Sequence, residues 1–223
     1  MRIPRRAWAE VLARVVDDAH LVSGDQLSIM LDGAVRQIGL TAEVLVVDLA
    51  QRVLRPVSPQ MFPPVGVEGT VAGRTYQFGE ILPANDGHGG RLLWVPMLDG
   101  TERLGVLRIG LAQKMINDQE LRGRCWSLSG LMGHIVVSKM AYSDWLRRLR
   151  SNGPLSAPSE LLWQLLPPRT FATEQVLVTA LLEPTIKSPE MATTMRRNPA
   201  RCTWQCSTRS ATTCRHAWLP LWR

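Results

Sequence analysis

One stretch decides the fold that we predict: VEGTVAGRTYQFGEIL, at residues 67–82. Its centre, 70–76, is typical of a short helix, and Gln77-Phe-Gly-Glu80 turns the chain out of it. The glycines Gly69, Gly73 and Gly79 recur along the stretch. The chain on either side changes to the patterns of strands, so the short helix lies between two groups of strands.

Downstream, a polar loop is expected over 83–90, followed by a strand at 91–98. Asp99-Gly100 is a strong signal for a tight turn, and 103–111 is the second strand of that hairpin. Apolar positions at helical spacing then predict one long helix over about 117–149.

Upstream, two helices precede the first strands. Residues 7–19 form the first helix, and Ser23 or Asp25 can cap a second one, which Gly39 closes. The apolar face of the first helix is expected to hold Trp8, Val11, Leu12, Val15 and Val16. A strand at 43–49 pairs with 52–57, and 58–66 is a loop. This order predicts an α+β fold, an antiparallel sheet with helices packed on one face.

Three segments, taken together, resemble a GAF domain. They are the glycine-containing stretch 67–82, LWVPM at 93–97 and RLGVL at 103–107. The resemblance covers residues 23–146 and makes 1–22 a leader helix. It implies a sensory or dimerising module with five or six strands, and an unknown small ligand. We expect His88, Trp94 and Tyr76 to bind that ligand; the alternative for His88 is a flexible turn.

Beyond a linker at 147–158, the segment 159–185 resembles the entry to a protein serine phosphatase domain of the SpoIIE/RsbU type. It carries ELLWQLLPP at 160–168, then a strand at 175–182 that ends at Glu183-Pro184. The family would continue with an acidic metal-binding motif, and Mn²⁺ or Mg²⁺ is implied only for intact relatives. The chain continues instead as Ile186-Lys-Ser-Pro-Glu-Met191.

The composition changes at the same place. The chain has 223 residues and a net charge of +7, and residues 186–223 supply +6 of it through seven basic side chains and one acid. Those residues also hold three of the four cysteines and three of the eight tryptophans, but no Gly, Asp, Val, Phe or Tyr. A globular segment of that length rarely lacks all five residue types.

A frame shift after codon 185 accounts for this change. Reading one base away permits a phosphatase-like continuation with Gly-Asp-x-x-Asp and Asp-x-x-Gly-His-Asp motifs. The hypothesis makes 186–223 a disordered, out-of-frame tail, and 159–185 a short helix-strand fragment of a truncated domain. The carboxylates that would hold two metal ions are then absent. We therefore predict no catalytic residues, no metal site and no enzyme activity.

The predicted function is that of a sensory or regulatory GAF module of a serine phosphatase regulator, in a pathway of the anti-sigma-factor-antagonist type. One alternative is an active serine/threonine phosphatase, as the resemblance implies for intact relatives. Another is zinc or nucleic-acid binding through the tail, whose zinc-type ligands are Cys202, Cys206, Cys214 and His216. The spacing matches no familiar finger and the arginines are scattered, so neither partner is expected.

Two further expectations concern partners and compartment. The helix over 117–149 has an apolar stripe longer than one domain face requires, which makes it a candidate homodimer interface; Cys125 and His134 on it are interpreted as a buried thiol and a satisfied histidine. Charged residues from Glu10 onward exclude a signal-peptide apolar region, and no stretch is apolar enough for a membrane helix. We predict a cytoplasmic protein.

Overall fold

The computed structural model describes residues 2–58, 62–86 and 89–151 with their side chains, and then the backbone of residues 170–172, 177–184, 191–197 and 202–207. Internal contacts divide the chain into two compact units, Met1–Pro154 and Leu155–Arg223. None of the helices among these residues is long and apolar enough to cross a bilayer.

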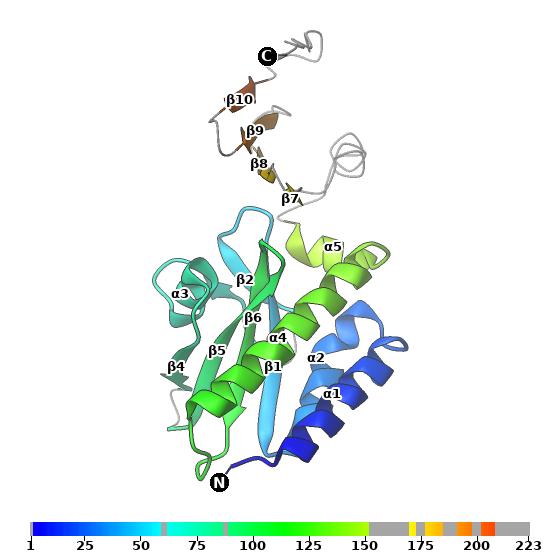
Figure 1. Cartoon of the computed structure of the whole chain (residues 1–223), viewed down its shortest axis with the longest axis vertical. Coiled ribbons are helices and arrows are strands. Elements are labelled where there is room, and N and C mark those ends of the chain that lie inside the picture. Colours follow the sequence, from blue (N-terminus) through cyan, green and yellow to red (C-terminus); the bar gives the residue numbers. More distant parts are fainter. Residues whose placement is uncertain are drawn as a thin grey trace, which may run out of the picture. The chain divides into compact units, whose positions relative to one another are not determined.

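A six-stranded antiparallel sheet forms the centre of the first unit (Figure 1). Its order is β3-β2-β1-β6-β5-β4, with bounds β1 Leu40–Val47, β2 Val53–Pro56, β3 Val65–Gly66, β4 Leu82–Asn85, β5 Arg91–Asp99 and β6 Glu102–Leu111. The predicted pairs β1–β2 and β5–β6 form. The edge strands β3 and β4 lie in segments predicted as loops, because strands this short carry too little alternation to be recognised.

Helices cover one face of this sheet, as predicted. They are α1 Arg5–Ala19, the short 3-10 helix η1 Gly24–Gln26, α2 Leu27–Arg36 and α4 Gln119–Met140. Figure 1 shows α1, α2 and α4 along one side of the strands, where they bury the larger of two hydrophobic clusters. On α1 the buried stripe is Trp8, Val11, Val15 and Ala19. Val16 was placed on that face wrongly: it is 44% exposed, because it lies one helical step, about 100°, beyond Val15.

The predicted short helix is α3, Val71–Phe78, and it packs against the opposite face. Thr70 caps it, since its Oγ1 accepts the Gly73 N–H at 2.9 Å. Gly79 ends it in the left-handed conformation at φ 71°. Gly73 lies so close to Val67 that a Cβ there would overlap the Val67 backbone. The stretch 67–82 thus fixes one helix against the sheet.

The long helix predicted over 117–149 is two helices, so that prediction is wrong in its continuity. α4 ends at Met140, and α5 runs over Asp144–Arg150. The Ser143 N–H still donates to the Lys139 carbonyl at 2.8 Å, and the Ser143 Oγ then caps α5 by accepting from the Leu146 N–H at 3.4 Å. Ser143-Asp144 is a helix-start signal that the continuing apolar spacing concealed. Residues 147–150, assigned to the linker, belong to α5.

The second unit contains an antiparallel sheet in the order β10-β9-β8-β7. Its strands are β7 Thr170–Ala172, β8 Leu177–Pro184, β9 Met191–Arg197 and β10 Cys202–Ser207. The strand predicted at 175–182 is β8. Two strands therefore lie in the tail that was expected to be disordered. Thr193 and Thr194 have β propensity, and β8 offers their segment an edge on which to pair. The helix expected near 159–166, Cys214 and His216 lie outside the described residues.

Candidate functional site

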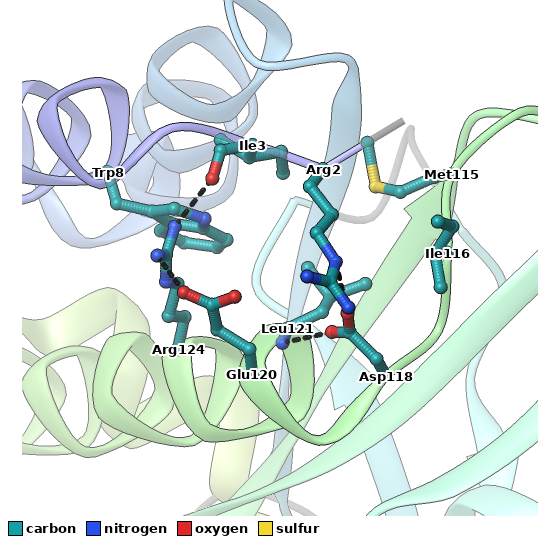
Figure 2. A pocket seen from close by; sticks show the side chains of 9 residues that line it. All are labelled: Arg2, Ile3, Trp8, Met115, Ile116, Asp118, Glu120, Leu121 and Arg124. Carbon is teal, nitrogen blue, oxygen red and sulfur yellow. Dashed lines mark hydrogen bonds and ion pairs between the residues drawn. The ribbon is translucent and has the colours of Figure 1, made fainter.

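One small cavity of the first unit does not accommodate a ligand. It lies between the N-terminal segment and the start of α4, and its volume is about 10 Å³, room for a single water molecule. Figure 2 shows that ion pairs and hydrogen bonds fill its surroundings: Arg2 pairs with Asp118 at 3.2 Å, and Arg124 donates to the Ile3 carbonyl at 2.8 Å. These contacts fasten the N-terminal segment to α4.

The same ion pair bears on the pKa of Asp118. The backbone N–H of Leu121 hydrogen-bonds the Asp118 carboxylate at 2.9 Å and, together with Arg2, lowers its pKa. This is the ordinary effect of a helix N-cap on an acid. The cluster in Figure 2 is therefore structural.

Two larger depressions lie on the surface. One, of about 400 Å³, runs between α1 and α2 and is lined mainly by apolar side chains such as Leu21 and Ile29. The other, of about 280 Å³, lies beside the edge strand β4, near Arg91. The Arg91 guanidinium is engaged by the carbonyls of Ala112, Gln113 and Met115. Neither depression contains a residue that the sequence predicted as ligand-binding.

Two of the three predicted site residues meet on the face that α3 covers. Tyr76 comes from α3 and Trp94 from β5, and both are buried in the smaller hydrophobic cluster. The Tyr76 hydroxyl donates to Gln51 Oε1 at 3.2 Å. The third, His88, lies outside the described residues. The sequence thus identified one end of a cluster whose other members it did not name.

Those other members form a row across three strands. Arg108 on β6 is the direct cross-strand partner of both Trp94 on β5 and Glu43 on β1. Directly opposed residues of antiparallel strands share one face of a sheet. Leu45 and Val47, two and four residues beyond Glu43 on β1, belong to the cluster under α3, so the row lies on that face. An aromatic ring, a guanidinium and a carboxyl group therefore stand side by side there.

Phe62, which follows β2, completes the row. Its ring meets that of Trp94 edge-to-face, with centroids 6.1 Å apart, and the Arg108 guanidinium carbon lies 4.8 Å from the Phe62 centroid. Such contacts hold a guanidinium over an aromatic face without neutralising its charge. Arg108 is thereby oriented within the site.

Glu43 is the most perturbed acid among the residues with described side chains. It is only 4% exposed, and burial raises its pKa from 4.5 to about 7. A hydrogen bond with Ser28 and the charge of Arg108 oppose the rise, and the charge of Asp32 adds to it. Perturbed titratable groups of this kind concentrate at functional sites.

The local fold explains why Glu43 is buried. β2 pairs with β1 only over Leu45–Val47. The first residues of β1, which include Glu43, therefore have no partner in β2. α2 supplies the missing acceptors: Asp32 accepts the Ala42 N–H at 2.9 Å, and Ser28 Oγ accepts the Val44 N–H at 3.0 Å. The helix therefore closes the edge of β1 beside Glu43.

Several polar atoms of this region have no hydrogen-bond partner among the described residues. They are Glu43 Oε1, Arg108 Nε and, on α3, Thr75 Oγ1. Leaving such atoms buried and unsatisfied costs roughly 1–3 kcal/mol each. A carboxyl group, a guanidinium and aromatic faces are the groups with which proteins fix a small polar molecule. The arrangement is chemically suited to binding.

Neither a metal-ligand cluster nor a reactive thiol is found among the described residues. No three His, Cys, Asp or Glu side chains of the described residues gather there as a ligand set. Cys125 is fully buried on α4, and burial raises the pKa of its thiol to about 12. His134 is exposed on the same helix, with Nδ1 3.7 Å from Asp99 Oδ1.

Comparison with known protein structures identifies the fold. No family model matches the sequence, and no curated protein matches it. Solved structures do. The GAF domain of an Acinetobacter phosphoenolpyruvate-protein phosphotransferase aligns at a TM-score of 0.51 and 14% identity, over 60% of this chain and 95% of that one. The fold is that of a GAF domain.

Two further GAF structures agree. The domain from a Coxiella burnetii phosphoenolpyruvate-protein phosphotransferase has a TM-score of 0.52 at 12% identity, over 61% of this chain and 96% of that one. The GAF domain of A. Aeolicus nlh2, solved in an inactive state, has a TM-score of 0.50 at 14% identity, over 60% of this chain and 98% of that one. At such low sequence identities, the similarity shows only the GAF fold. Function must therefore be inferred from the residues of the row, Trp94, Arg108 and Glu43.

Proposed function

We propose that this chain is a sensory or regulatory module that binds a small polar molecule at the α3 face of its GAF fold. The observation that carries the proposal is the row Trp94–Arg108–Glu43, in which a buried Glu43 and a half-buried Arg108 each keep a buried, unsatisfied hydrogen-bonding atom beside aromatic rings. A ligand with an acceptor for Arg108 and a polar group for Glu43 would satisfy both. Tyr76 and Trp94 then border the ligand, as the sequence predicted.

Ligand-observed NMR with a library of common metabolites tests this proposal. The variant Arg108→Met removes the guanidinium and keeps an unbranched apolar chain. Arg103→Met is the matched control, because Arg103 lies on the same strand, β6, but is exposed. We expect at least one metabolite to bind the wild-type protein and Arg103→Met, and to lose binding in Arg108→Met. If no metabolite binds, or if all bind Arg108→Met equally, the proposal is wrong.

We further propose that the module belonged to a serine phosphatase regulator whose catalytic domain is interrupted after residue 185. The phosphatase-like segment 159–185 and the change of composition that follows it support this origin. The gene's nucleotide sequence decides it, since the neighbouring frame must be open and phosphatase-like. The purified chain should release no phosphate from a phosphoserine peptide when Mn²⁺ is added. Metal-dependent turnover would refute the inactive assignment.

We also propose that two copies associate through α4. Residues 125–138 contain no Asp, Glu, Lys or Arg, although Trp126, Ser127, Gly130 and His134 among them are exposed. A surface helix normally presents charged residues on its outer face. An uncharged outer face with small residues permits close approach of a second helix.

A further inference from the structure

The turn that joins β1 to β2, residues 48–51, is held from both faces of the sheet. It is also braced internally: Asp48 Oδ1 accepts the N–H groups of Arg52 at 2.7 Å and Val53 at 3.1 Å, and the Asp48 carbonyl accepts the Gln51 N–H at 3.0 Å. The Asp48 side chain thus fixes the turn by accepting backbone N–H groups that follow it in the chain, as Asp side chains do in turns.

On the α3 face, the turn is bound by Tyr76. The Tyr76 hydroxyl donates to Gln51 Oε1 at 3.2 Å. Gln51 is the only residue other than glycine, within the described backbone, that has a positive φ, at 56°. This conformation costs free energy for a side chain of its type and is maintained by the surrounding contacts. The Tyr76 contact therefore helps to set the position of the turn.

On the other face, the turn is bound by α5. The Leu49 N–H donates to the Arg150 carbonyl at 2.8 Å, and Arg150 Nε donates to the Val47 carbonyl at 3.2 Å. Arg150 is buried, and its guanidinium also contacts Met140 Sδ at 3.0 Å. The last residue of α5 is thus docked on the end of β1 by its main chain and its side chain together.

We infer that the turn 48–51 is a mechanical relay, through which a change at α3 alters the docking of α5. α3 and α5 contact the same four-residue turn from opposite sides, so any shift of Gln51 that accompanies a change at Tyr76 also moves the Leu49 N–H away from, or toward, its acceptor on Arg150. α5 is the last helix of the first unit, and the chain continues from it into the second. The relay rests on the proposed sensory function, because it takes the α3 face as the place where a ligand acts.

Amide hydrogen exchange of the full chain, followed by NMR, tests the relay without a ligand. Tyr76→Phe removes the hydroxyl and retains the ring. Its matched control is Thr75→Val, which removes a neighbouring hydroxyl on α3 that has no hydrogen-bond partner in the described structure. The Ser151 N–H caps the end of α5 by donating to the Arg147 and Arg148 carbonyls, each at 3.1 Å. We expect Tyr76→Phe to speed exchange of the Leu49 and Ser151 amides by roughly 3- to 10-fold, the factor expected for one net hydrogen bond. Thr75→Val should leave both unchanged.

A double-mutant comparison separates the relay from general loosening. Gln51→Asn introduces a residue that adopts positive φ more readily than Gln does, and it shortens the side chain that carries the acceptor. In that background Tyr76→Phe should change the Leu49 and Ser151 rates by less than about twofold. Amides in the β5–β6 pairing report global unfolding, and the relay requires that Tyr76→Phe change the exchange of Leu49 and Ser151 by a larger factor than it changes the exchange of these amides. The relay is refuted if Tyr76→Phe has no effect on α5, or has the same effect with Gln51→Asn. Either result leaves the ligand proposal standing, and failure of ligand binding leaves this measurement valid.

Discussion

Replacement of Glu43 by Gln should stabilise the protein at neutral and alkaline pH, but not at acid pH. Burial raises the pKa of Glu43 from 4.5 to about 7, so the folded state prefers the neutral carboxyl group. A raised pKa contributes stability below about pH 4.5, and this contribution is lost as the pH rises to about 7. At ~1.36 kcal/mol for each pH unit, the difference amounts to roughly 3 kcal/mol.

Gln resembles the protonated acid in shape and charge, so the variant should lack this pH dependence. At pH 4.5 Arg108 then has an almost uncharged neighbour in both folded proteins, and their free energies of unfolding should be close. At pH 8 the variant should be more stable by about 3 kcal/mol, because the wild-type carboxylate is charged and buried. The hydrogen bond with Ser28 and the charge of Arg108 favour the charged form, and the pKa of about 7 already includes their effect.

Urea unfolding at intervals from pH 4.5 to pH 8.5 measures the difference. Glu80→Gln is the matched control, since Glu80 is exposed on the loop after α3. Its free energy of unfolding should follow that of the wild-type protein across the range. The prediction is wrong if the difference in free energy of unfolding between Glu43→Gln and wild type is constant with pH, or if it grows toward acid pH. A constant difference would mean that Glu43 keeps its ordinary pKa in the folded protein, and a difference that widens toward acid would mean that Arg108 and Ser28 stabilise the carboxylate more than burial destabilises it.

Three further outcomes follow from packing. Gly73→Ala should lower the free energy of unfolding by about 1–3 kcal/mol in a denaturant titration, because its Cβ would overlap the Val67 backbone; an unchanged midpoint would contradict the close packing of α3. Cys125 should remain unmodified by iodoacetamide at pH 8 until the protein unfolds, as peptide mapping would detect, since its thiol is buried with a pKa of about 12. Light scattering at tens of micromolar, about the range where weak interfaces become populated, should show a dimer that Trp126→Glu dissociates; a wild-type monomer would exclude the α4 interface.

The sequence predicted the fold where local patterns were strong. Alternation and the Asp99-Gly100 turn located the β5–β6 hairpin, and Thr70 and Gly79 marked the ends of α3. It failed where two signals competed. At Ser143 the apolar spacing that continues into α5 outweighed a helix-start signal, so two helices were predicted as one. The strands β9 and β10 were missed because composition was weighed above the β propensity of individual residues.

The candidate site shows a different limit. Tyr76 and Trp94 were predicted as ligand-binding because they are aromatic residues of two GAF-like segments, whereas the sequence places Glu43 only at the polar start of a buried strand. Its importance depends on register: only the pairing of β1 with β6 and of β6 with β5 brings Glu43 and Trp94 to the two sides of Arg108. A slip of one residue on β1 would turn Glu43 to the opposite face. Local sequence patterns determine which strands form, but the chemistry of the α3 face depends on how those strands are aligned. The relay through the turn 48–51 depends on the same alignment.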